Sequence, residues 1–280
     1  MIRRFLFLYA LLTTAGALCA ACAQGGPPFI TDDPGTPGAG HWEINLGWTG
    51  EHHAGSGDYE LPNLDMNYGW GDRLQLKFEV PLAAATDENN TTRLGLGDSL
   101  AGIKWRPYEH HRAGETPTDE NMNFSLGFYP QVLVSNPTAS VRRGVVDPGP
   151  QYYFPIEFTT RFGPIAFNGE LGRWIGNRHV PDRWGRGLIV GHAFSDRFEL
   201  YGEIYDLTDI DHAADESAQR SETLDCGLRR TLDHAGHLRL LLMSGRSLHH
   251  ARAANDEPNW IAYAGLQFRF GGHDEPGHLP

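Results

Sequence analysis

Apolar and polar side chains alternate along most of the chain. In the clearest case, residues 73–80, one set of alternate positions is apolar and the other is charged or amide: Leu74, Leu76, Phe78 and Val80 against Arg73, Gln75, Lys77 and Glu79. Successive side chains of a β-strand point to opposite faces, so this pattern predicts a strand. Four charged or amide side chains cannot lie in a dry core without partners, so the apolar face must be buried or in contact with lipid.

Similar segments recur from residue 41 to residue 270. They are 41–50, 61–70, 73–80, 100–108, 122–134, 151–161, 165–171, 188–194, 198–205, 224–229, 238–242 and 260–270. About twelve strands of roughly 8–12 residues suit a bilayer, which a tilted strand crosses in ~9–11 residues. We therefore predict an all-β fold, a transmembrane antiparallel β-barrel of about twelve strands. A soluble β-sandwich or lipocalin-like barrel is the alternative.

The connections between these segments alternate between short and long. Those near 69–72, 162–164, 195–196 and 232–237 are short, whereas 51–58, 81–93, 135–148, 176–183, 208–221 and 247–258 are long and polar. Short periplasmic turns and longer external loops are typical of outer-membrane barrels. Segment 109–121 is the exception, because it is long although its position in the alternation predicts a short turn.

Tryptophan gives a second indication of a membrane barrel. All seven lie near predicted strand ends: Trp42, Trp48, Trp70, Trp105, Trp174, Trp184 and Trp260. An amphipathic indole is favoured at the membrane–water interface, so these residues are expected to form interfacial belts.

The N-terminus has the features of a secretory signal peptide. Arg3 and Arg4 precede an apolar stretch from 5 to 18, and residues 21–23 fit a small-x-small cleavage site. We assign residues 1–23 to a signal peptide, with a lipoprotein modified at Cys22 as the alternative. Cleavage leaves Cys226 as the one remaining cysteine, so no intramolecular disulfide is expected.

Composition excludes two classes of protein. The 280 residues include 23 basic and 35 acidic side chains, a formal net charge of −12, which argues against a nucleic-acid partner. No apolar run approaches the ~18 residues that a membrane helix needs. The chain is 40% hydrophobic, a value that alternation and long polar loops keep low.

Four segments carry a resemblance to a known family. They are PPFITDDP at 27–34, GAGHWEIN at 38–45, LGLGDSLAGIKW at 94–105 and FELYGEIY at 198–205. They resemble the bacterial outer-membrane β-barrel family of meta-pathway phenol degradation transporters, over most of the stretch from 27 to 270. The resemblance implies a channel or porin-like role and leaves the substrate open. Such barrels usually end in a terminal Phe, whereas Phe270 is followed here by residues 271–280.

The inward-facing positions supply candidate lumen residues. They are Glu199, Tyr201, Glu203, Tyr205, Arg229, Arg239, Lys77, Lys104, Glu157 and Arg161. Carboxylates opposite guanidiniums would create a transverse field that favours polar solutes, whereas a structural salt-bridge network would fill the barrel. A stacking wall for apolar solutes is the other candidate, built from Tyr129, Tyr153, Tyr201, Tyr205 and Tyr263.

The segment before the first strand contains Thr31, Asp32 and Asp33 followed by a proline. It could plug or line the periplasmic mouth or bind a cation, and the alternative is a capping turn, since Asp-Pro favours turns. We divide the chain into the signal peptide, an N-terminal periplasmic segment at 24–40, the barrel at 41–270 and a C-terminal tail at 271–280.

Signatures of catalysis and metal binding are weak. Ser195 and His192 are three residues apart and therefore lie on opposite strand faces. Adjacent histidine pairs point apart on a strand and are expected to be solvated in loops. We expect no enzymatic activity, no catalytic residue, no cofactor and no metal.

These observations favour an outer-membrane channel for passive uptake of small organic molecules, aromatic ones among them. A barrel of about twelve strands lies between small filled barrels and large open porins, so a narrow or partly plugged lumen is expected. The alternative is a non-conducting barrel with a structural or partner-binding role. The expected partners are outer-membrane lipids, small organic solutes and the barrel-assembly machinery.

Overall fold

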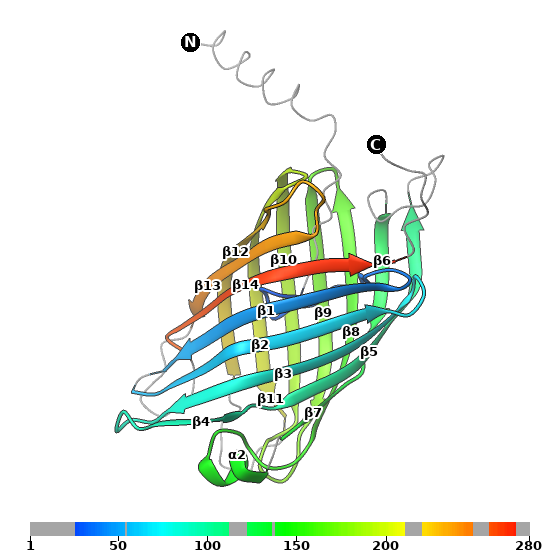
Figure 1. Ribbon diagram of the computed structural model, residues 1–280. Helices are drawn as coiled ribbons and strands as arrows, with labels where there is room; N and C mark the ends of the chain where they lie inside the picture. Colours follow the sequence, from blue (N-terminus) through cyan, green and yellow to red (C-terminus); the bar gives the residue numbers. More distant parts are fainter. Residues whose placement is uncertain are drawn as a thin grey trace, which may run out of the picture.

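The computed structural model describes residues 26–53, 55–111, 122–135, 138–210, 220–248 and 258–272. These residues form one antiparallel sheet that curls into a barrel, with a single short helix among them (Figure 1). The predicted signal peptide and the tail from 273 onward lie outside the described residues. No helix in the described ranges is long and apolar enough to cross a membrane.

The described residues contain fourteen strand segments. They are β1 (His41–His52), β2 (Gly57–Gly69), β3 (Leu74–Thr86), β4 (Thr92–Leu96), β5 (Ser99–His111), β6 (Met122–Phe128), β7 (Gln131–Val134), β8 (Gln151–Phe162), β9 (Ile165–Ile175), β10 (Arg183–Ser195), β11 (Phe198–Asp209), β12 (Arg220–Thr231), β13 (Leu238–Ser247) and β14 (Trp260–Gly271). The helix is α2 (Thr138–Arg143).

Two of the barrel strands are interrupted. β4 and β5 both pair with β3, and β6 and β7 both pair with β5 and β8. The second interruption falls at Pro130, which has no backbone N–H to donate to a ladder. If each interrupted strand is counted once, the described segments form twelve barrel strands, which confirms the predicted fold and strand number.

The barrel closes where its first and last strands meet. β1 pairs antiparallel with β14 along its whole length, from His41 opposite Gly271 to His52 opposite Trp260. Within the described residues the sheet therefore has no long free edge, and its backbone hydrogen bonds are made between strands. This is what a sheet surrounded by lipid requires.

The alternation in the sequence separates the two faces of the barrel wall. On β3, Phe78 faces outward with 47% of its surface exposed, whereas Gln75 faces inward with 5% exposed. The other exposed large side chains of the strands are mostly aliphatic or aromatic, and the buried ones include many amides, carboxylates and basic groups. The interior is thus polar and the exterior apolar, the reverse of a soluble protein.

The long connections lie at one end of the barrel, where α2 contacts β4 (Figure 1). The predicted loop at 81–93 is shorter than expected, because β3 continues to Thr86 and β4 begins at Thr92. Backbone hydrogen bonding extends this hairpin beyond the apolar part of the wall, where side-chain alternation no longer marks the strands. The predicted exception at 109–121 lies mostly outside the described residues.

Candidate functional site

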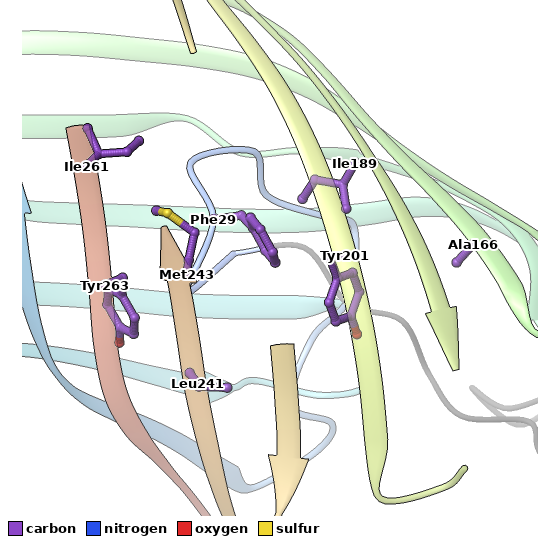
Figure 2. Close-up of a cluster of buried hydrophobic side chains, with 8 residues drawn as sticks. All are labelled: Phe29, Ala166, Ile189, Tyr201, Leu241, Met243, Ile261 and Tyr263. Carbon is purple, nitrogen blue, oxygen red and sulfur yellow. The ribbon is translucent and has the colours of Figure 1, made fainter. Parts of the chain in front are cut away.

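The chain before β1 lies inside the barrel. We define residues 26–37 as the plug segment. The sequence predicts that this stretch plugs or lines the periplasmic mouth. In the structure Thr31 is fully buried and Phe29 packs on Tyr201 with ring centroids 5.4 Å apart. Figure 2 shows Phe29 among apolar side chains that point inward from the barrel strands. The plug segment therefore occupies the lumen.

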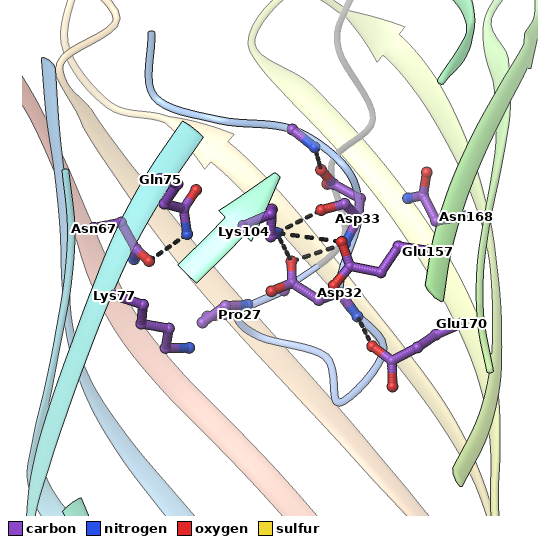
Figure 3. A network of polar contacts seen from close by, with 12 residues as sticks. Pro27, Asp32, Asp33, Asn67, Gln75, Lys77, Lys104, Glu157, Asn168 and Glu170 are labelled. Carbon is purple, nitrogen blue, oxygen red and sulfur yellow. Dashed lines mark hydrogen bonds and ion pairs between the residues drawn. The ribbon is translucent and has the colours of Figure 1, made fainter. Parts of the chain in front are cut away.

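Lys104 on β5 is the main ionic contact of the plug segment, and it is only 2% exposed (Figure 3). Its Nζ lies 2.9 Å from Asp32 Oδ1, donates to the Asp33 carbonyl at 2.5 Å and lies 3.7 Å from Glu157 Oε2. The ammonium also lies 4.7 Å from the centroid of the Tyr129 ring. Burial alone would raise the pKa of Asp32, but Lys104 and Lys77 outweigh it and hold that pKa below its usual range. The plug carboxylate is therefore ionised and paired.

Two wall carboxylates bind the backbone of the plug segment. Glu203 on β11 accepts the Thr31 N–H at 2.6 Å and the Ile30 N–H at 3.2 Å. Glu170 on β9 accepts the Asp32 N–H at 3.1 Å. These carboxylates supply the acceptors that the plug segment, which is not part of a sheet, lacks.

Arg229 on β12 holds the start of the plug segment. Its Nη2 donates to the Gly26 carbonyl at 3.1 Å and to the Pro27 carbonyl at 2.8 Å. The guanidinium also lies 5.2 Å from the centroid of the Tyr201 ring. Basic wall groups therefore bind plug carbonyls, and acidic wall groups bind plug N–H groups.

Glycines in the wall make room for the plug segment. A Cβ at Gly187 would collide with Thr31 Oγ1, and one at Gly227 would lie 2.5 Å from the Leu242 carbonyl oxygen of β13 and 2.8 Å from the Phe29 ring. A side chain at position 187 fits only if the plug moves, whereas one at position 227 would also clash with the neighbouring strand, so close approach requires glycine at both positions.

Substituting Gly187 by alanine is therefore expected to displace the plug segment and leave the barrel folded. Limited proteolysis from the periplasmic side should cut the plug faster in Gly187→Ala than in wild type. Gly202→Ala is the matched control, because its Cβ would meet no atom closer than 3.8 Å. Equal cleavage rates in the two variants would contradict this placement of the plug.

The plug segment separates two cavities. The outer cavity, about 470 Å³, lies toward the long connections and is lined by the plug and by β1–β3, β5, β7–β9, β11, β13 and β14. The inner cavity, about 30 Å³, lies toward the short turns beside Thr36, Asn67 and Gln267. The larger space thus lies on one side of the plug segment and the smaller one on the other.

The predicted lumen residues fall into two groups in the structure. Lys104, Glu157, Glu203 and Arg229 converge on or beside the plug and its motif of Thr31, Asp32 and Asp33. Tyr201 also contacts the plug segment, through Phe29. The others lie elsewhere on the inner wall: Lys77 beside Asp65, Glu199 bonded to Tyr201, Tyr205 at the outer cavity, and Arg161 and Arg239 near Glu199.

Sequence reasoning missed several residues that line the site. Glu60, Asn63, Asp65, Glu79 and Glu170 all line the outer cavity. Alternation marks all of them as inward-facing except Glu60, which lies three residues from Asn63 and shares its face only because the register shifts between them. Trp174, predicted for the interfacial belt, instead lines this cavity and stacks on Tyr153 at 4.3 Å. The even-numbered positions of β9 face inward, which proximity to a strand end does not reveal.

Solved structures of outer-membrane barrels resemble this fold. The COG4313 outer membrane channel from Pseudomonas putida F1 is similar with a TM-score of 0.62 and 12% identity, covering 88% of this chain and 100% of that one. The NanC porin is similar with a TM-score of 0.51 and 7% identity, covering 81% of this chain and 98% of that one. No protein-family model matches the sequence, and no curated protein matches it. The shared architecture shows that the chain folds as an outer-membrane β-barrel.

Proposed function

We propose that the protein is a passive channel of the bacterial outer membrane that takes up small organic molecules when its plug segment moves. The observation that carries this proposal is the division of the lumen into a 470 Å³ outer cavity and a 30 Å³ inner cavity by residues 26–37. A cavity of this size accommodates a small organic molecule. Displacing the plug segment joins the two spaces.

The contacts that hold the plug segment are suited to reversible movement. Apart from the packing of Phe29, they are mostly hydrogen bonds and ion pairs between plug and wall. Water replaces such contacts in an open lumen, so each contributes only about 1–3 kcal/mol net. No covalent chemistry is part of the proposal, and solutes are sorted by size, charge and stacking on aromatic side chains.

The other structural features agree with this location and these partners. The outward apolar face would contact outer-membrane lipids, and the predicted signal peptide would direct export to the barrel-assembly machinery. Aromatic solutes would find stacking surfaces at Tyr153, Trp174 and Tyr205.

Liposome swelling with neutral solutes of increasing size tests the proposal. We expect liposomes that contain the protein to swell in small solutes and to lose this response as solute size approaches that of the outer cavity. Liposomes that lack protein are the control. Absence of flux for every solute, in the wild type and in variants with a loosened plug, would contradict a channel.

That outcome would favour a non-conducting barrel, the second candidate function. The observation behind it is the number of wall groups committed to the plug: Lys104, Glu170, Glu203 and Arg229 all bind it. Such a plug would be a permanent part of the fold.

A further inference from the structure

Acidic side chains outnumber basic ones in the lining of the outer cavity. Among the described residues that line it, seven are carboxylates and one is an ammonium, that of Lys77; the carboxylates are Asp32, Glu51, Asp58, Glu60, Asp65, Glu79 and Glu170. Lys77 lies 3.4 Å from Asp65 and 3.3 Å from Glu79, and Lys104 pairs with Asp32. The remaining charge of the cavity is negative, which attracts cations and repels anions.

In one part of this lining the N–H and O–H donors already bond to neighbouring side chains, and hydrogen-bond acceptors remain. The Asn63 amide nitrogen donates to Glu60 Oε2 and to Glu79 Oε1, both at 2.7 Å, and the Thr49 hydroxyl donates to Glu60 at 3.1 Å. Asn63 is 8% exposed, and its side-chain oxygen accepts no hydrogen bond from the described residues. A buried acceptor without a donor is costly, so this cluster is complementary to a ligand that brings N–H donors.

The opposite wall is aromatic. In the order of strands around the barrel, β8–β11 lie across from β1–β3. Tyr153, Trp174 and Tyr205 line the cavity from that wall, and the rings of the first two stack at 4.3 Å with an interplanar angle of 15°. Aromatic faces bind both flat rings and cations. The cavity thus has an acidic wall and an aromatic wall facing each other.

We propose that the outer cavity binds small aromatic ammonium ions, with the ammonium at Glu60, Asn63 and Glu79 and the ring against Tyr153 and Trp174. Such a molecule supplies the positive charge, the N–H donors and the flat surface that the two walls require. Selection of these cations during passage rests on the proposed channel function, whereas their binding in the cavity does not.

Three probes of similar size separate charge from shape: benzylammonium, benzyl alcohol and benzoate. In planar bilayers that contain the full-length mature protein, reversal potentials should show benzylammonium permeating at least about tenfold better than benzoate. Calorimetric titration of the detergent-solubilised protein should show binding of benzylammonium and none of benzoate, with benzyl alcohol weaker than benzylammonium.

The Glu60→Gln/Glu79→Gln variant keeps side-chain size and replaces both carboxyl groups by amides. We expect it to lose most of the benzylammonium preference in both measurements, whereas Glu222→Gln on the outward face of β12 keeps the wild-type preference. Binding without flux would overturn the channel and support the cation site. Flux with no preference for the cation, or equal binding of benzoate, would overturn the cation site and leave the channel in place.

Discussion

Replacing Lys104 by methionine is expected to raise the single-channel conductance of the barrel several-fold. The substitution removes the ammonium that contacts Asp32, the Asp33 carbonyl and Glu157. Removing one partner of a buried ion pair typically costs ~3–5 kcal/mol, because the other charge stays buried without compensation. Asp32 can escape this cost by leaving the lumen with the plug segment, so the variant favours the open state. Planar-bilayer recording measures the change directly.

Lys77→Met is the matched control. Lys77 is also an inward-facing ammonium, but its two close ion pairs are with wall carboxylates, Asp65 and Glu79. We expect this variant to lose stability and, because the outer cavity becomes more negative, to become more selective for cations, while its total conductance rises less than that of Lys104→Met. If Lys104→Met conducted like the wild type and Lys77→Met did not, the assignment of Lys104 as the main ionic contact of the plug would be wrong.

Introducing arginine at Phe78 is expected to destabilise the folded barrel by ~2–4 kcal/mol, the cost of a lipid-facing arginine at the bilayer midplane. Phe78 faces outward near the middle of β3, between Met66 on β2 and Ala101 on β5. Its replacement puts a charge into the apolar band without altering the lumen. Reversible urea unfolding in lipid vesicles, followed by tryptophan fluorescence, measures the loss.

Phe162→Arg is the control for this substitution. Phe162 is also exposed, at 66%, but it ends β8 beside a short turn. An arginine near the interface costs only ~0–1 kcal/mol. Equal losses in the two variants would contradict the assignment of the outward face of β3 to the bilayer interior.

The wall of the barrel could be predicted from the sequence because alternation is a local property. Alternation along the strand places Lys77 and Glu79 inward and Phe78 outward, and it can be recognised from neighbouring residues alone. The same rule places Lys104 and Glu203 in the lumen. Twelve strands followed from the number of alternating segments, although the interruption at Pro130 divides one strand in two.

The site depended on information that alternation does not contain. Residues 26–37 have no strand or helix period, so nothing in them indicates how deep they reach. The approach of Thr31 to Gly187 depends on the path of the plug through the closed barrel. The cluster of Glu60, Asn63 and Glu79 depends on the register between β2 and β3, which shifts between Glu60 and Asn63. Local sequence determines neither the path of the plug nor this register.

Tethering the plug segment to the wall tests most directly whether its movement opens the lumen. A Cβ at Gly127 would lie 3.1 Å from Pro34 Cβ, close to the ~3.5–4.5 Å of disulfides. Single-channel conductance of Pro34→Cys/Gly127→Cys, with Cys226 replaced by serine, is therefore compared before and after reduction. The account predicts a closed barrel when the disulfide is formed and wild-type conductance once it is reduced. Equal conductance in both states would contradict it.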